Sequence, residues 1–340
     1  MVEEFVDPRE VAWHPRRRFS LHGHGAAEAR LLQAFQSGKL HHAWLISGLR
    51  GIGKATLAYR FARFLAQPNV NANVVSLHVT PESPTSHMLS AGAHPNIFVL
   101  QRSPDDKKKR LKSEIAVEDS REAIGFMNRT SATGGWRVVI VDPADDLNAA
   151  SANALLKMVE EPPAHSIILI VCHQPGRLLR TIRSRCIHLP LNPLDVPAVL
   201  RVLHELPPEA VAADEEALRL AAELSGGSPG RALELIGSRG AAAYADFLRR
   251  PNLTPAACVE IGAAFTGRET AEDYAIFCDL LTGWVAAKTR DAALAGRGEA
   301  LALAHGDMVY SLRQTDALNL DRRQTVTDAL LRLGEALKAS

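Results

Sequence analysis

Apolar runs alternate with amphipathic stretches along the first half of the chain. Short apolar runs bounded by glycine or polar residues predict buried strands at 43–48, 96–102, 136–142 and 166–172. Apolar residues at helical spacing predict helices at 25–38, 54–67, 117–130 and 148–161. Because these strands are apolar on both faces and alternate with helices, the pattern favours an α/β fold with a parallel sheet covered by helices.

Other segments show different patterns. Residues 1–20 are polar and rich in arginine, and residues 68–95 are irregular. The last part of the chain is rich in alanine and leucine and is predicted to be helical, with turn signals at 206–210, 225–230 and 249–255. We therefore expect three domains, with boundaries at 1–190, 191–245 and 246–340.

Composition sets broad limits on function. The chain has 340 residues, of which 46% are hydrophobic and 23% charged, and its net charge is +1. A net charge this small gives the protein no overall electrostatic attraction to nucleic acid or to a membrane surface. No apolar run approaches the ~20 residues that span a bilayer, and the acidic start does not resemble a signal peptide. The four cysteines form no Cys-x-x-Cys pair, so we expect reduced thiols and a cytoplasmic protein.

A phosphate-binding loop follows the first predicted strand. The sequence GLRGIGK at 48–54 has G-x4-G-K spacing and opens a predicted helix. The backbone N–H groups of such a loop, the helix N-terminus and the lysine ammonium all favour phosphate. A glycine turn with a surface lysine is the alternative. The candidate nucleotide-binding residues here are Gly48, Gly51, Gly53, Lys54 and Thr56.

Two positions lack the chemistry that nucleotide hydrolysis needs. Ala55 stands where a hydroxyl normally binds Mg²⁺. Thr56 is rotated by about 100° around the helix, so it cannot simply replace that hydroxyl. Asp142 ends a predicted strand where a metal-organising carboxylate is expected, but Pro143 follows where a glutamate usually polarises water. Together these losses argue against turnover at this site.

Two further carboxylates follow on the next turn. Asp145 and Asp146 precede the helix predicted at 148–161. Aspartate is a favoured N-cap residue, because its oxygen accepts from the unpaired N–H groups of the first turn. We interpret both residues as caps of this helix rather than as catalytic groups.

Later motifs carry a resemblance to a known family. The stretches SANALLKMVEEPPAH at 151–165 and PGRLLRTIRSRCIHLPL at 175–191 resemble the clamp-loader branch of the AAA+ ATPases. Within that branch they are similar to the family of bacterial DNA polymerase III delta-prime subunits. With the phosphate loop and GGSPGRALEL at 226–235, the resemblance covers about residues 21–235. It is weaker over the last hundred residues.

The resemblance implies an architecture and partners. It implies an AAA+ P-loop core, a small helical lid and an all-α C-terminal collar that joins subunits in a pentameric ring. The implied partners are the ATPase (tau/gamma) and delta subunits, the sliding clamp and, indirectly, primed DNA. ATP binding without hydrolysis is possible, and no cofactor is required.

The same resemblance implies roles for single residues. Arg185 of the Ser-Arg-Cys motif matches an arginine finger that acts in trans on a neighbour's γ-phosphate. Arg231 matches a second sensor arginine, and with Asp142 it completes the candidate nucleotide site. His173 departs from the small polar residue expected at the first sensor position. Cys186 is interpreted as a small buried residue rather than a nucleophile.

The chain also has histidines that could bind a metal and basic runs that could contact DNA. Some delta-prime subunits carry a cysteine-ligated zinc module after the phosphate-loop helix, but residues 67–95 contain no cysteine, and three histidines remain. These are His78, His87 and His94, and their spacing predicts no zinc site. DNA contact remains possible through Lys107–Arg110 or Arg16–Arg18, although basic runs are usually solvated faces.

The sequence therefore predicts a non-hydrolysing clamp-loader subunit that supplies Arg185 to a neighbouring ATPase. Two alternatives stay open. One is an active AAA+ ATPase, either the clamp-loader motor subunit or a helicase-like motor. The other is a nucleotide-binding regulator unconnected to replication, which would have no reason to keep the Ser-Arg-Cys and Glu-Glu-Pro-Pro motifs.

Overall fold

The computed structural model describes residue 7 and residues 9–68, 70–105, 110–129, 135–250, 252–318 and 320–339. The chain divides into two compact units. The first comprises Met1–Ala212 with Gly226–Arg231, and the second comprises Ala213–Ser225 with Ala232–Ser340. The expected boundaries between core, lid and collar stay a prediction.

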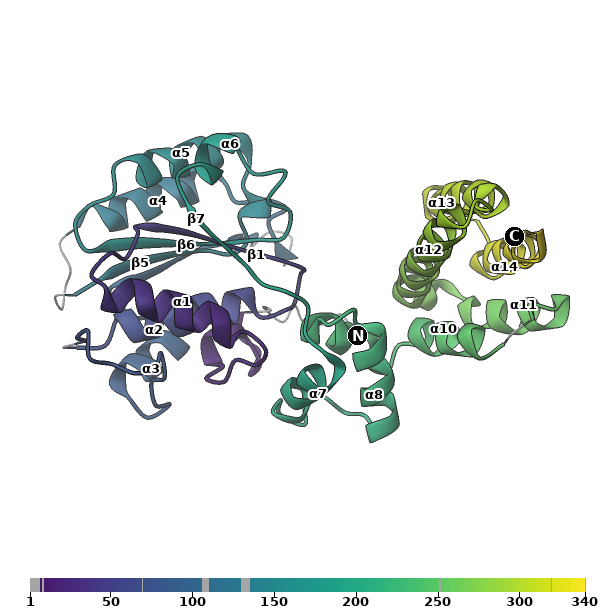
Figure 1. Ribbon diagram of the computed structural model, residues 1–340, viewed down its shortest axis with the longest axis horizontal. Helices are drawn as coiled ribbons and strands as arrows, with labels where there is room; N and C mark the ends of the chain where they lie inside the picture. Colours follow the sequence, from purple (N-terminus) through teal and green to yellow (C-terminus); the bar gives the residue numbers. More distant parts are fainter. Residues whose placement is uncertain are drawn as a thin grey trace. The chain divides into compact units, whose positions relative to one another are not determined.

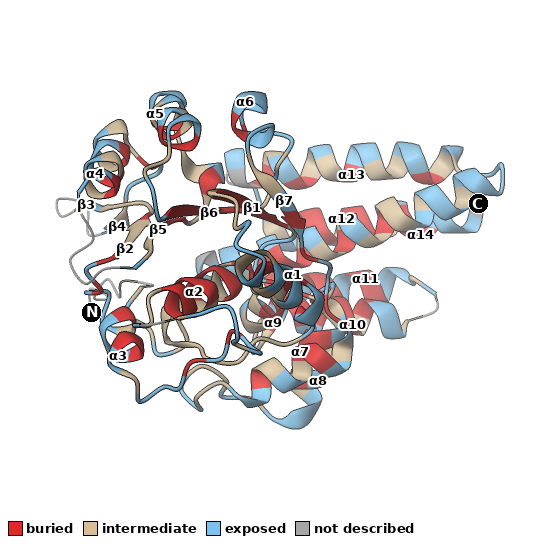
Figure 2. Ribbon diagram, turned by 60° about the vertical axis from the view of Figure 1, so that its left-hand side comes forward, coloured by how far each residue is buried: buried red, intermediate tan, exposed pale blue. Residues whose placement is uncertain are grey.

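A five-stranded parallel sheet forms the centre of the first unit, in the order β2-β5-β6-β1-β7. Its strands are β1 (Ala43–Ser47), β2 (Ile97–Leu100), β5 (Arg137–Val141), β6 (Ser166–Cys172) and β7 (Ile187–Pro190). Every residue of β1 and β6 is buried, as Figure 2 shows, because both are central strands covered on both faces. A separate two-stranded antiparallel sheet is formed by β3 (Pro104–Asp105) and β4 (Arg110–Leu111), a pair that the sequence pattern did not predict.

Helices cover both faces of this sheet. In Figure 1, α1 and α2 lie on one face, and α4 and α5 lie on the other. The helices of the first unit are η1 (Pro15–Arg17), α1 (Gly25–Gln36), α2 (Lys54–Leu65), α3 (Pro84–Ser90), α4 (Val117–Met127), η2 (Ala144–Asp146), α5 (Ala149–Glu160), α6 (Arg180–Arg183) and α7 (Val196–His204). The parallel sheet and its helices confirm the predicted α/β fold.

The elements of the first unit that the sequence pattern missed include α3 and β7. Helix α3 lies in the segment expected to be irregular, and its signals are Ser83, which caps the helix by accepting from Ser86 N–H, and Pro84 at the first helical position. Strand β7 pairs only with β1, so it is an edge strand with an exposed histidine and proline. Its short, half-polar sequence gives no continuous apolar run.

The second unit is helical. Its helices include α8 (Glu215–Leu224), α10 (Arg239–Arg249), α11 (Pro255–Gly262), η3 (Ala263–Phe265), η4 (Arg268–Thr270), α12 (Ala271–Leu294), α13 (Glu299–Ala317) and α14 (Arg322–Ala339), while α9 (Pro229–Leu235) begins in the first unit and ends in the second. Aromatic side chains such as Phe265 and Phe277 pack in its core with the apolar faces of α12 and α14. This confirms the expected helical C-terminal region.

Candidate functional site

The ends of three neighbouring strands meet at one edge of the sheet. In the parallel register Ser47 of β1 lies opposite Cys172 of β6, and Val141 of β5 lies opposite Ile170. The phosphate loop follows β1, Asp142 follows β5 and His173 follows β6. Because carboxyl ends of parallel strands share an edge, these segments converge as they do in other doubly wound sheets that bind ligands.

The phosphate loop has the backbone shape that its glycines predict. The φ angles of Gly48, Gly51 and Gly53 are 146°, 78° and 105°. All three lie in the region that favours glycine. Lys54 begins α2 directly after the loop, with Ala55 and Thr56 in the same first turn.

Lys54 is held by its own loop. Its side chain is 3% exposed, and Nζ donates to the carbonyl oxygens of Gly48 (2.7 Å) and Leu49 (2.5 Å). Burial lowers the pKa of Lys54 to about 8, against the raising effect of Asp142 and Asp145. These two contacts leave one of the three N–H donors of the ammonium for another acceptor.

The next loop carbonyls are held by other segments of the first unit. The Ser228 hydroxyl donates to Arg50 O (2.7 Å), and the N–H of Gly230 donates to Gly51 O (3.0 Å). A methyl group at Gly51 would lie only 2.6 Å from Ser228 Oγ and 2.8 Å from Gly230 Cα. Gly51 is therefore needed for close approach as well as for its positive φ.

His24 supports the loop from the start of α1. Its side chain is 4% exposed, and Nε2 lies 2.7 Å from Ile52 O, so this nitrogen donates to the carbonyl. Burial lowers the pKa of His24. Sequence reasoning missed His24, Ser228 and Gly230. Their only signal is that LHGHG and GGSPG lie within the stretches that carry the family resemblance.

Arg231, the predicted second sensor, lies in α9 beside this contact. Its backbone N–H donates to Ser228 Oγ (3.1 Å). Ser228 therefore bridges the start of α9 and the phosphate loop, through Arg231 N–H on one side and Arg50 O on the other. This bridge lies wholly within the first unit.

Asp142 occupies the position where the sequence predicts a metal-organising carboxylate. Burial raises its pKa to about 6, with Lys54 acting in the opposite direction and Asp146 adding to the rise. The Asp142–Pro143 peptide bond is cis. Pro143 offers no side-chain group that could polarise water, and Ala55 offers none that could bind Mg²⁺.

The interpretation of Asp145 and Asp146 as helix caps is wrong. Asn148 is the N-cap of α5, and its side chain accepts from Ser151 N–H at 2.9 Å. Asp145 instead accepts from the backbone N–H groups of His173 (2.6 Å) and Gln174 (2.7 Å). Asp146 lies 2.9 Å from the Arg102 guanidinium.

His173 stands at the end of β6, where the first sensor residue was expected. Burial is the main cause that lowers its pKa to about 4, and Lys54 adds to the effect. Within the described residues, its buried Nδ1 atom has no hydrogen-bond partner. The preceding thiol of Cys172 has its pKa raised to about 12 by burial, so it is not a reactive nucleophile.

Arg185 lies apart from the phosphate loop contacts, just after α6. Its Nη2 atom lies 2.9 Å from Glu160 Oε1 at the end of α5, and Nη1 donates to Thr181 O at 3.1 Å. The side chain is 42% exposed. Burial raises the pKa of the adjacent Cys186 thiol to about 12, which fits a packing role for this residue.

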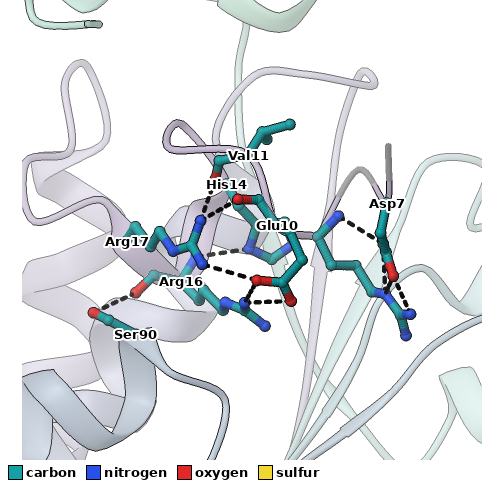
Figure 3. Close-up of polar contacts among 8 residues, drawn as sticks. Asp7, Glu10, Val11, His14, Arg16, Arg17 and Ser90 are labelled. Carbon is teal, nitrogen blue, oxygen red and sulfur yellow. Dashed lines mark hydrogen bonds and ion pairs between the residues drawn. The ribbon is translucent and has the colours of Figure 1, made fainter. Parts of the chain in front are cut away.

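The arginine run near the N-terminus has partners within the chain (Figure 3). Arg16 Nη2 lies 2.8 Å from Glu10 Oε1, and Arg17 Nη2 lies 3.0 Å from Glu10 Oε2. Arg18 Nη1 donates to Glu205 O at 3.1 Å. These contacts give the run a structural role. In the other candidate DNA-contacting run, Lys107–Lys109 lie outside the described residues, and Arg110 begins β4.

The part of the chain that the structure describes contains neither a cluster of metal ligands nor a membrane-spanning helix. No group of three or more His, Cys, Asp or Glu side chains is arranged to hold a metal ion in these residues. Each described helix is too short or too polar to cross a bilayer. Of the three candidate zinc ligands, His94 is buried, and its Nδ1 accepts from Asn96 N–H at 3.2 Å.

Comparison with protein families identifies the chain. Residues 23–195 match the family described as DNA polymerase III, delta subunit. The chain belongs to this family. Together with the two delta-prime relatives described next, this match confirms the resemblance to delta-prime subunits that the motifs predicted. The match covers the sheet, the phosphate loop, Asp142 and Arg185, whereas Arg231 lies beyond it.

Three relatives are 32–39% identical to this chain over the parts that align. The delta-prime subunit of Pseudomonas aeruginosa DNA polymerase III is 39% identical over 201 residues, covering 58% of this chain and 56% of that protein. The Escherichia coli delta-prime subunit is 36% identical over 208 residues, covering 61% and 58%. The gamma subunit of Buchnera aphidicola is 32% identical over 225 residues, covering 66% and 58%. The chain thus matches a little more than half the length of each relative.

Proposed function

We propose that this chain is a non-hydrolysing, delta-prime-like subunit of a DNA polymerase III clamp loader. The observation that carries the proposal is the chemistry at two positions of the phosphate site. Ala55 and Pro143 stand where a Mg²⁺-binding hydroxyl and a water-polarising carboxylate are needed. A site that keeps its loop but lacks both groups supports binding or scaffolding rather than cleavage.

In this proposal the catalytic contribution is made in trans. Arg185 is exposed, and its guanidinium would reach the γ-phosphate of ATP held by a neighbouring ATPase subunit of the tau/gamma type. The chain would act from the cytoplasm within a pentameric ring that also contains a delta subunit. The C-terminal helices would join the collar, and the assembly would load the sliding clamp onto primed DNA.

The chain's own site is proposed to hold ATP at most, without cutting it. Positive φ angles at the loop glycines and the position of Lys54 support phosphate binding. Lys54 is already satisfied by Gly48 O and Leu49 O, so the fold does not depend on a nucleotide to pair this cation. We propose that no cofactor is required and that no zinc is bound.

The experiment is to reconstitute the loader with Arg185→Ala and measure DNA-stimulated ATP hydrolysis. An arginine finger is worth roughly 10³-fold or more at the site it serves, so turnover at that one site should be nearly abolished. The matched control is Arg121→Ala, which removes an exposed arginine of α4 whose nearest carboxylate lies 3.9 Å away. Normal ATPase in an assembled Arg185→Ala loader would refute the proposal.

A further inference from the structure

An ion pair joins the two motifs that carry the family resemblance. Glu160, the last residue of α5, belongs to the Glu-Glu-Pro-Pro motif, and Arg185 belongs to the Ser-Arg-Cys motif. Glu160 Oε1 and Arg185 Nη2 lie 2.9 Å apart, with side chains 39% and 42% exposed. The contact links the end of α5 to the segment that follows α6.

The backbone under Arg185 is fixed independently of this pair. Arg185 N–H donates to Ile182 O at 3.1 Å, and Ile182 is fully buried among residues of the sheet core. The side chain then has two anchors, Glu160 Oε1 on Nη2 and Thr181 O on Nη1. The position of the guanidinium is therefore set by Glu160 and Thr181 together.

We propose that Glu160 is a positioning residue for Arg185. This inference rests on the proposed function of Arg185 as an arginine finger. A guanidinium has five N–H donors, and the two contacts on Nη1 and Nη2 leave others to meet phosphate oxygens. Holding a long side chain in place beforehand removes rotamer freedom that would otherwise be lost in reaching the transition state.

The negative charge of Glu160 shows that it can help only by positioning Arg185, and not by attracting the nucleotide. The Glu160 carboxylate is negative, so it repels an approaching phosphate and cannot itself favour nucleotide binding. Its benefit must come from orientation. Orientation of the finger acts on turnover rather than on ATP affinity, and it depends on an acceptor oxygen rather than on a full charge. A glutamine in this position would retain such an oxygen.

The test uses the reconstituted loader and compares Glu160→Ala with Glu160→Gln. Because exposed ion pairs make small contributions, we expect Glu160→Ala to lower kcat for DNA-stimulated ATP hydrolysis by about fivefold without raising KM. Glu160→Gln should recover most of the lost turnover. In an Arg185→Ala background, Glu160→Ala should cause no further loss, because the group that it positions is gone.

The matched control is Glu161→Ala. Glu161 is the adjacent exposed carboxylate at the same helix end, and within the described residues no hydrogen bond or ion pair of its side chain is found. Unchanged or raised kcat in Glu160→Ala, or an equal loss in Glu161→Ala, would overturn the inference. If Glu160→Ala is silent while Arg185→Ala is impaired, positioning fails and the proposed function stands. If Arg185→Ala is silent, both fail.

Discussion

Two ionisable side chains, Asp142 at the end of β5 and Lys54 at the start of α2, influence each other's pKa. Burial raises the pKa of Asp142 to about 6 and lowers that of Lys54 to about 8. Each group supports the charged form of the other, but for both the effect of burial is larger. Neither pKa shift could be predicted from sequence, because both depend on how deeply the strand end is covered.

The raised pKa of Asp142 predicts a pH-dependent cost to stability. The folded chain binds this proton up to about pH 6, while the unfolded chain releases it near the ordinary value of 3.8. The free energy of unfolding therefore falls between about pH 4 and pH 6 on account of this group. Asp142→Asn should raise that free energy by about 3 kcal/mol at pH 7.5 and by much less at pH 4.

Urea unfolding of both proteins at several pH values measures this difference. The gap between variant and parent should widen from pH 4 to pH 6 and then stay constant. A gap that is equal at all these pH values would contradict the assigned pKa. Since Asn keeps the size of Asp, packing changes should affect all pH values alike.

The arginines near the N-terminus are another case in which the local sequence does not predict the contacts of single residues. In the sequence, the run Arg16–Arg18 is a basic patch and a candidate DNA contact. In the structure its guanidinium groups contact Glu10 and Glu205, and Glu205 is far away in the sequence. A carboxylate partner that is distant along the chain leaves no mark on the local pattern.

At the scale of elements, the turn after β5 makes contacts that depend on the order of strands in the sheet. Local rules correctly predict α5, and they supply a plausible cap from the aspartates that precede it. The cap is Asn148 instead, and Asp145 reaches the end of β6. This contact exists because β5 and β6 are neighbours in the sheet, a fact that local periodicity does not contain.

Asp145 should therefore stabilise the junction between two strands. Asp145→Ala removes the acceptor of two backbone N–H groups, so we expect a loss of about 1–2 kcal/mol in the free energy of unfolding. Asp146→Ala removes only a partly exposed ion pair with Arg102, and its cost should stay below about 1 kcal/mol. Thermal or urea unfolding of the two variants compares them directly, and equal losses would refute the assigned role of Asp145.

Across the whole molecule, the first unit holds a phosphate loop without the groups that complete hydrolysis. We expect the isolated 340-residue chain to release no phosphate from Mg-ATP above the background of a Lys54→Ala variant. Ala55 and Pro143 provide the physical reason, because neither side chain can ligate a metal or accept a proton. Phosphate release measured over hours is the appropriate assay.

The same assay decides between this function and an active motor. Steady turnover that disappears in Lys54→Ala would establish a self-sufficient ATPase and overturn the non-hydrolysing assignment. A parallel ATP titration of the isolated chain, with and without Lys54→Ala, measures whether the loop still holds a nucleotide. A folding check on Lys54→Ala by circular dichroism is the control, because this lysine is buried.

The sequence by itself determined the alternation of strands and helices, the phosphate loop and the absence of two catalytic groups. It could do so because periodicity and the identity of a side chain at a motif position are local properties. Only the tertiary structure decided that Asp145 joins two strands, that Ser228 and Gly230 close on the loop, and that Glu160 holds Arg185. Those contacts follow from strand order and packing, which bring together groups that no local pattern connects.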